Sequence, residues 1–265
     1  MNNIRIAKII RTVILYLLMQ CPVADALTDA TTSLDDHSIY TSFNDFNTRI
    51  RDGIISKAEA HAELSGKLAA IRAEYYRRGG RDYAQTEWVF PVAGYSSEAI
   101  EKRGKHGFVA SGYDFFSGNS HGGHPAYDIF IRDRNQDNRD DRTGRAVQVL
   151  SMTGGVVVAL ENEWRQGSKL RGGRYIWIYD PANNLMVYYA HNEELFVKLG
   201  MIVKPGDLLA VIGRSGLNAA KHRSPTHLHI SVLRLTDGQP LPVPVYSELQ
   251  RAKNLSKPPY PSNHE

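Results

Sequence analysis

The chain has 265 residues, of which 42% are hydrophobic and 23% charged, a composition typical of a soluble globular protein with one well-buried domain and an extension, or with two small domains. Its 32 basic and 28 acidic residues give a formal net charge of +4, which is too small to indicate nucleic-acid binding, and no long basic run is present. The composition also excludes a disordered, a collagen-like and a coiled-coil protein.

The first 26 residues have the three parts of an export signal. A basic start is followed by a short apolar run at 12–19 and by Ala24-Asp25-Ala26, the small-x-small pattern that signal peptidase cuts. The basic residues are Arg5, Lys8 and Arg11. Because a membrane span needs about 20 apolar residues, this run is too short for one. We therefore predict export to the periplasm or the extracellular space after cleavage near Ala26, with no stable membrane span in the mature protein.

Cys21 is the only cysteine, and two alternatives to cleavage at Ala26 remain open. In a lipoprotein, Cys21 would be acylated, although Leu18-Met19-Gln20 is a poor match to the small residues expected before such a cysteine. The segment would otherwise remain as an uncleaved anchor. Cleavage at Ala26 removes the cysteine, so the mature chain has no disulfide and no thiolate ligand. Any metal is then held by histidines and carboxylates.

Residues 41–80 carry two helical patterns, which predict a helical hairpin after the polar segment 27–40. Ser56 and Glu59 form a capping box at the start of the second helix, and Gly79-Gly80 ends it. The apolar faces consist of Phe43, Phe46 and Ile50 in the first helix and of Leu64, Leu68, Ile71 and Tyr75 in the second. We expect the hairpin to brace the domain that follows.

From Trp88 onward the sequence consists of short runs rich in Val, Ile, Tyr and Trp, separated by Gly, Asn and Asp. Such runs predict β-strands, and the main helical feature between them is one turn expected at 192–197. The expected strands are Trp88–Val92, Tyr127–Ile131, Gly155–Leu160, Tyr175–Tyr179, Met186–Ala190, Leu208–Ile212 and Leu228–Leu233. The pattern predicts a mainly β fold: an antiparallel β-sheet domain with an N-terminal helical hairpin.

Histidines and one aspartate lie in or beside three of the expected strands. His227 and His229 project from one face of their strand, because side chains alternate between faces. Asp128 lies in a second strand with His124 just before it, and His191 follows a third. A catalytic zinc ion takes three ligands from His or carboxylate side chains and keeps one position for water. Each pair alone is weak evidence, but the combination favours a metal site.

The order of these motifs resembles the lysostaphin-type, or LytM-like, zinc endopeptidases, which hydrolyse peptidoglycan. The matching motifs are His124-x-x-x-Asp128, Tyr189-Ala190-His191 and His227-x-His229. Phe90-Pro91-Val92, Gly154-Gly155-Val156-Val157 and the glycine-marked stretch 199–216 also resemble segments of that family. The likeness covers residues 88–236, more than half of the chain.

The resemblance implies a metallopeptidase domain with one catalytic Zn²⁺. Its ligands would be His124, Asp128 and His229, and the catalytic residues would be His191 and His227, with no organic cofactor. One imidazole would accept the proton of the metal-bound water while the other stabilises the oxyanion, and the sequence leaves open which ring does which. His121, close to His124 in the chain, is a rival ligand that the family spacing disfavours.

Residues 133–141 suggest a second ion site. Asp133, Asn135, Asp137 and Asp141 match the oxygen ligands at positions one, three, five and nine of a calcium loop. Two departures weaken the match, since Asn138 replaces the usual Gly and Gly144 replaces the bidentate Glu. A Ca²⁺ site and a charged surface loop are therefore both compatible with the sequence.

The expected function is hydrolysis of peptide bonds in peptidoglycan cross-links by a metal-activated water. The alternatives are a non-catalytic wall-binding or hydrolase-activating protein of the same fold, and a structural or adhesive β domain. We expect a monomer that binds peptidoglycan peptides and no nucleic acid. The expected divisions are 1–26 signal peptide, 27–87 flexible segment and hairpin, 88–240 peptidase domain and 241–265 Pro-rich tail. Cleft loops at 161–174 and 217–225 would set specificity, with Lys221, His222 and Arg223 as candidates for meeting substrate carboxylates.

Overall fold

The computed structural model describes residues 38–256. The chain divides into residues 1–35 and 36–265, and every described residue lies in the second unit. The predicted export signal, its cleavage site at Ala26 and Cys21 lie outside the described residues, as do residues 257–265 of the predicted tail. Among the residues that the structure describes, no helix combines the length and the hydropathy needed to cross a membrane.

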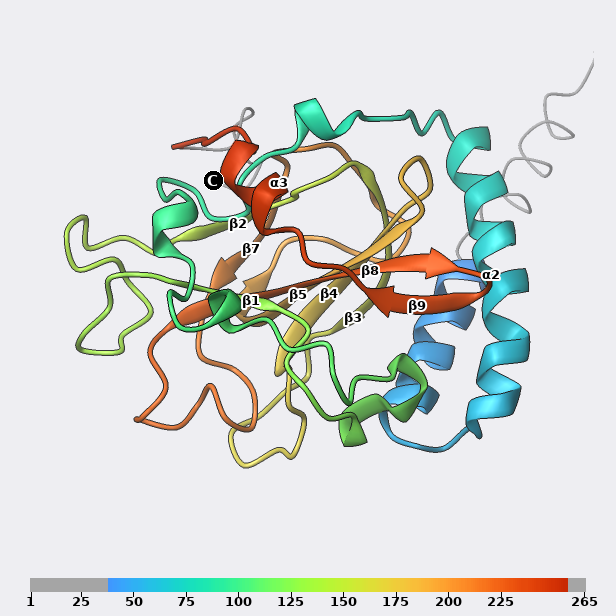
Figure 1. Ribbon diagram of the computed structural model, residues 1–265, viewed down its shortest axis with the longest axis horizontal. Coiled ribbons are helices and arrows are strands. Elements are labelled where there is room, and N and C mark those ends of the chain that lie inside the picture. The colour runs from blue at the N-terminus through green and yellow to red at the C-terminus, as the bar shows by residue number, and fades with distance from the viewer. Residues whose placement is uncertain (1–37, 257–265) are drawn as a thin grey trace, which may run out of the picture. The chain divides into compact units, whose positions relative to one another are not determined.

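An antiparallel sheet forms the centre of the described unit (Figure 1). Its strands are β1 (Tyr127–Phe130), β2 (Gln148–Leu150), β3 (Gly155–Glu161), β4 (Arg174–Asp180), β5 (Leu185–Leu195), β6 (Ile202–Val203), β7 (Leu208–Ile212), β8 (His227–Thr236) and β9 (Gln239–Pro242). The order along the sheet is β1-β8-β5-β4-β3-β6, with β9 paired to β8, β7 to β5 and β2 to β7. Every pairing is antiparallel, which confirms the predicted mainly β fold.

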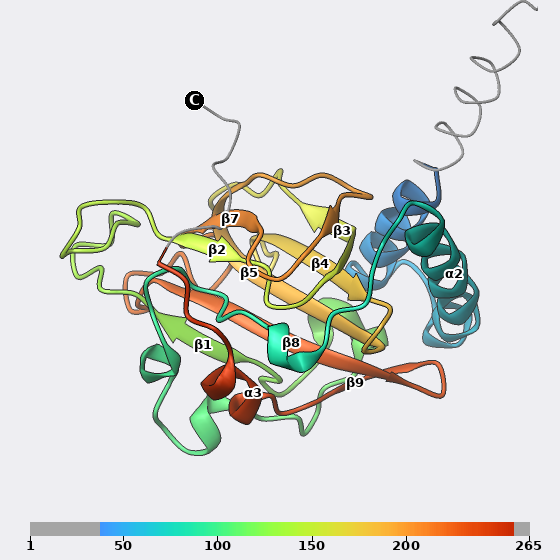
Figure 2. The same ribbon diagram turned by 90° about the horizontal axis from the view of Figure 1, so that it is seen from above.

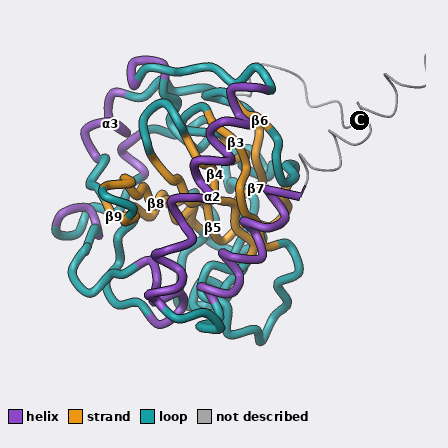
Figure 3. The backbone as a smooth tube through the Cα atoms, turned by 90° about the vertical axis from the view of Figure 1, so that its right-hand side faces the viewer, coloured by secondary structure: helices purple, strands orange, loops and turns teal. Residues whose placement is uncertain are grey.

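A helical hairpin covers one face of the sheet, as predicted (Figures 2 and 3). Residues 38–51 are helical and α2 (Lys57–Arg77) follows. The hydroxyl of Ser56 accepts a hydrogen bond from the backbone N–H of Glu59, whose carboxylate accepts one from the N–H of Ser56, so the predicted capping box is present. All the predicted apolar positions of both helices are buried, in one cluster with Val158, Trp177 and Met186 of β3, β4 and β5.

The opposite face of the sheet carries the second core cluster. It includes Val157, Ile178 and Val187, which alternate with the residues that face the helices. The short helix α3 (Tyr246–Arg251) adds Leu249 to this cluster. Strand β9 continues past the division expected at residue 240. Four 3-10 turns complete the described unit, at Gln85–Glu87, Ser97–Ala99, Lys105–Gly107 and Phe115–Ser120.

Two local expectations are wrong. Residues 88–92 are buried but form no strand, because they make only the isolated bridges Val89–Lys253 and Val92–Val149. The helical turn expected at 192–197 is absent because β5 continues to Leu195, with an irregular register to β7 between Asn192 and Glu194. The sequence analysis also missed β2, β6, β9 and α3, each of six residues or fewer and too short for a clear period.

Candidate metal centre and cleft

The register of three adjacent strands brings the predicted site residues together. Asp128 in β1 pairs with His229 in β8, and His229 pairs on its other side with Ala190 in β5. His227 lies two positions before His229 and therefore projects from the same face. His191 follows Ala190 directly. Residues separated by about a hundred positions in the chain thus meet on one surface of the sheet.

Three of these side chains form a group that fits a metal ion. The candidate ligand atoms of His124, Asp128 and His229 all lie within 4.8 Å of one another. His124 Nε2 lies 3.3 Å from Asp128 Oδ1, and His229 Nδ1 lies 3.0 Å from the same oxygen. Ligands of a tetrahedral zinc ion lie roughly 3.3 Å apart, given zinc–nitrogen distances of about 2.0–2.1 Å. The spacing and the two-histidine, one-carboxylate chemistry both suit Zn²⁺.

A backbone carbonyl fixes the ring of His124. Its Nδ1 lies 2.9 Å from the carbonyl oxygen of Gly107, which can only accept, so Nδ1 carries the proton. Nε2 is the ring nitrogen that faces Asp128 Oδ1. The backbone of His124 is paired with Val109 in both directions, at 2.7 and 2.8 Å. This second contact pairs two residues outside the named strands and helps to orient a ligand that no strand carries.

His191 lies at the edge of the metal group in a strained backbone conformation. Its φ of 68° falls in the left-handed region, which is uncommon for a residue with a side chain. Its backbone N–H donates to Gly172 O at 2.9 Å, and its ring Nδ1–H donates to Ser215 O at 2.8 Å. These bonds hold the strained residue and leave Nε2 as the free ring nitrogen. The ring centroids of His191 and His229 are 5.4 Å apart.

His227 is placed beside both His191 and the metal group. Its ring centroid lies 4.9 Å from that of His191, and its Nε2 lies 3.7 Å from Asp128 Oδ1. The Nδ1–H donates to the carbonyl of Pro225 at 2.7 Å. The ring is therefore oriented in the same way as that of His191, with Nδ1 bonded to the backbone and Nε2 left for chemistry.

The protonation states of Asp128 and His229 favour the binding of a cation by the metal group. Although burial raises the pKa of Asp128, the hydrogen bonds from His124 and His229 hold that pKa well below its usual value, so the carboxylate is ionised at neutral pH. Burial lowers the pKa of His229 and lowers that of His191 well below the usual value. Both rings are consequently neutral at pH 7, as metal ligation and proton acceptance require.

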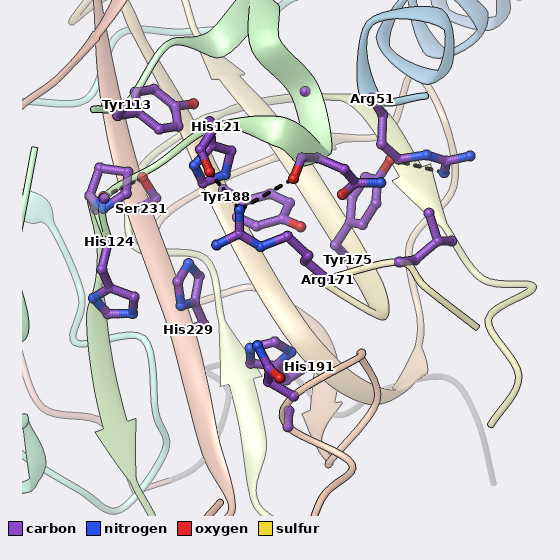
Figure 4. A pocket seen from close by; sticks show the side chains of 18 of the residues that line it. Arg51, Tyr113, His121, His124, Arg171, Tyr175, Tyr188, His191, His229 and Ser231 are labelled. Atoms are coloured by element: carbon purple, nitrogen blue, oxygen red, sulfur yellow. Dashed lines mark hydrogen bonds between the residues drawn. The ribbon is translucent and has the colours of Figure 1, made fainter. Parts of the chain in front are cut away.

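A cavity of about 300 Å³ opens over these residues (Figure 4). The metal group, His191 and His227 line it, together with the rings of Tyr113, Tyr175, Trp177 and Tyr188. Asn47, Ile50 and Arg51 of the N-terminal hairpin line it as well. The hairpin, expected only as a brace, therefore also contributes to the cleft wall.

His121 and Arg171 also line the cavity. His121 is outside the metal group, and its Nδ1–H donates to Gly122 O at 2.8 Å, so it is no rival to His124. The loop 161–174 lines the cavity, as predicted, through Leu170, Arg171 and Gly172. The sequence analysis singled out neither Arg171 nor the aromatic residues, because a single arginine in a glycine-rich loop forms no pattern. The loop 217–225 lines the cavity, as predicted, through Asn218, Ala219 and Ser224. Its three candidate cations, Lys221, His222 and Arg223, are exposed and do not line the cavity.

The structure does not support the calcium interpretation of residues 133–141. Both carboxylate oxygens of Asp133 accept backbone or hydroxyl hydrogen bonds, from Asp137 N, Asn138 N and Thr226 Oγ1. Asp141 accepts from Arg134 N, and Asn135 donates to Asp137. Within residues 38–256, the one group of three His, Cys or carboxylate side chains close enough to hold a metal ion is His124, Asp128 and His229. The alternating polar residues build turns instead, because Asp and Asn side chains readily bond the backbone two or more residues on.

Sequence comparison places this arrangement in a known family. Residues 140–242 match Peptidase family M23, a segment that holds His191, His227 and His229 but fewer than half of the chain's residues. This segment belongs to peptidase family M23. His124 and Asp128 precede the M23 segment, and the β1–β8 register joins them to it. The resemblance to the lysostaphin-type peptidases is thus confirmed.

Solved structures similar to this chain include three peptidases. A Ruminococcus gnavus chain assigned as a glycyl-glycine endopeptidase lytM is 25% identical, over 71% of this chain and 74% of that one, with a TM-score of 0.42. A zinc-containing peptidase from Vibrio cholerae is 21% identical, over 62% and 41%, with a TM-score of 0.37. The catalytic domain of the antimicrobial peptidase lysostaphin from Staphylococcus simulans is 21% identical, over 48% and 82%, with a TM-score of 0.34. No curated protein matches the sequence.

Proposed function

We propose that this M23 protein is a zinc-dependent endopeptidase that hydrolyses peptide bonds in peptidoglycan cross-links. One observation carries the proposal. The ligand atoms of His124, Asp128 and His229 lie within 4.8 Å of one another, and these residues line one cavity together with His191 and His227. The M23 match and the similarity to peptidases support the substrate class.

The three converging side chains would hold the zinc ion. When bound there, zinc supplies a nucleophilic water near neutral pH and polarises the scissile carbonyl. Asp128 contributes the negative charge that favours a divalent cation, and the Gly107 carbonyl keeps His124 in the tautomer that leaves Nε2 free. The fourth position of a tetrahedral site remains for water.

His191 and His227 divide the proton chemistry in this proposal. The lowered pKa of His191, caused by burial, keeps its Nε2 unprotonated and able to accept the water's proton. His227 is fixed by the Pro225 carbonyl and, when it also carries a proton on Nε2, can donate to the developing oxyanion or give that proton to the leaving amine. The bonds from Nδ1 to backbone carbonyls hold both rings in position, so neither has to reorganise during the reaction.

Digestion of purified cell wall tests the proposal. The zinc-loaded protein is expected to release peptides with new amino termini, identified by mass spectrometry, and chelation is expected to stop the release. Absence of product at every protein concentration would favour a non-catalytic wall-binding or hydrolase-activating protein.

For the cell, we propose export to the periplasm or the extracellular space, where this substrate lies, and action as a monomer.

A further inference from the structure

Arg171 is an unusual cation in the wall of the cleft. Two arginines line the cavity, Arg51 and Arg171. Arg51 is paired with Asp52 at 2.8 Å and with Glu161 at 2.7 Å. Among the described residues, no carboxylate pairs with Arg171. Its guanidinium donates only to backbone, from Nη1 to Asn119 O at 3.3 Å and to His121 O at 2.8 Å (Figure 4).

The free side of the guanidinium suits a carboxylate. Both backbone bonds of Arg171 come from Nη1, and in the described part of the chain Nη2 and Nε make no hydrogen bond. A guanidinium presents its donors as a rigid fork that matches the two oxygens of a carboxylate. The two backbone bonds hold the side chain in place, so that little conformational freedom is lost when a ligand binds.

A neutral hydroxyl lies beside Arg171. The next residue is Gly172, and the Tyr188 hydroxyl lies close to its backbone. A Cβ atom added at Gly172 would lie only 1.8 Å from the oxygen of that hydroxyl. No hydrogen bond of this hydroxyl occurs within the described residues, and it lines the same cavity. Burial raises the pKa of Tyr188 well above its usual value, so the phenol stays protonated and can donate.

Arg171 lines the same cavity as the metal group. Its Nη1 donates to the carbonyl oxygen of His121, and His121, His124 and Asp128 all line that cavity. Asp128 is the one carboxylate that lines the cavity, and it belongs to the metal group. With a divalent cation on that group, the cleft has an excess of positive charge close to the reacting atoms, which favours an anionic substrate.

We propose that Arg171, assisted by the Tyr188 hydroxyl, binds a free carboxylate of the substrate peptide close to the scissile bond. The inference rests on the proposed function and narrows its substrate class to peptides that carry such a carboxylate. The group is either the chain-terminal carboxylate or an acidic side chain of the peptide. Arg171 acts here as a specificity-determining residue, and a purely structural brace of the 119–121 loop would show no preference for the carboxylate.

Binding of wall peptides tests the proposal without turnover. The probe is the soluble peptide fraction that a glycan-cleaving enzyme releases from purified cell wall, before and after carbodiimide conversion of its carboxylates to amides. Titration calorimetry on zinc-loaded His191→Ala is expected to show about tenfold weaker binding, or more, after amidation. In the double variant with Arg171→Gln, amidation is expected to change affinity less than about threefold. Arg223→Gln, an exposed cation outside the cavity, is the matched control and should behave like the parent.

Three outcomes would overturn this inference. Amidation could weaken peptide binding equally with and without Arg171, or Arg171→Gln could weaken the binding of native and amidated peptides equally. The third outcome is that neither peptide form binds. Peptide release from purified wall by the native enzyme decides the proposed function separately. Peptides amidated only at the chain terminus, or only at their side chains, show which carboxylate Arg171 binds. Only amidation of the bound carboxylate should weaken binding as strongly as complete amidation does.

Discussion

Asp133 accepts a hydrogen bond from the hydroxyl of Thr226, the residue immediately before His227, at 2.6 Å. The same carboxylate accepts backbone N–H bonds from Asp137 and Asn138, and all of this is buried or half-buried. Asp133→Ala leaves three donors without their acceptor, so we expect the free energy of unfolding to fall by about 3 kcal/mol. Urea denaturation measures the change.

Asp137→Ala is the matched control for that variant. Asp137 lies in the same loop but is exposed, and its carboxylate accepts one backbone bond from Arg139 and one side-chain bond from Asn135. We expect it to cost about 1 kcal/mol or less. Equal losses in the two variants would contradict the role assigned to Asp133 as the anchor of this loop.

Gly216 keeps space for two cleft residues. A Cβ at Gly216 would lie 2.4 Å from the carbonyl oxygen of Arg171 and 2.9 Å from His191 Nδ1. We therefore expect Gly216→Ala to shift His191 and to lower kcat/KM for peptide release by about 100-fold, because catalysis tolerates little misplacement. Gly167 is the control, because its φ is also positive, at 90°, but an added Cβ would have no atom within 4 Å. Gly167→Ala therefore introduces backbone strain without a steric clash and should keep full activity. Comparable activity in the two variants would contradict this account.

Asp180 makes stability depend on pH in a definite direction. Burial raises its pKa to about 6, although Asn183 donates two hydrogen bonds to the carboxylate. The folded protein therefore binds more protons than the unfolded chain between pH 4 and 6, and Asp180 destabilises the fold as pH rises through that range. We expect the denaturation midpoint of the native protein to fall relative to that of Asp180→Asn between pH 4 and 6. Parallel curves for both proteins would contradict a raised pKa at Asp180.

Removal of His191 should separate catalysis from metal binding. The ring lies outside the three-ligand group, and its Nε2 is the proton acceptor in the proposed function. We expect His191→Ala to retain its zinc and to release wall peptides at least about 100-fold more slowly, the usual contribution of a general base. Loss of zinc together with activity would instead assign His191 to the metal site.

Local patterns predict much of this fold. The helical stripes, the capping box at Ser56 and six of the seven expected strands are recognisable from short stretches of sequence, and the structure confirms them. The Trp88–Val92 segment is apolar and β-branched, yet pairing partners decide whether such a run becomes a strand, and it has only isolated bridges. The short strands β2, β6 and β9 depend likewise on partners far away in the sequence.

The candidate site divides in the same way. The histidines and Asp128 were singled out because the order and spacing of their motifs resemble a known family. The left-handed backbone of His191 and the placement of Arg171, in contrast, arise from packing of distant loops. The calcium interpretation of 133–141 failed because alternating Asp and Asn residues serve turns as well as cations, and only the hydrogen bonds of Asp133 distinguish the two.

Zinc analysis of purified protein tests the central claim most directly. Metal content by mass spectrometry is expected to be about one zinc per chain in the native protein and in His191→Ala, and near zero in His229→Ala, which removes one of only three ligands. Zinc absent from the native protein, or retained in full by His229→Ala, would contradict a metal centre built from His124, Asp128 and His229.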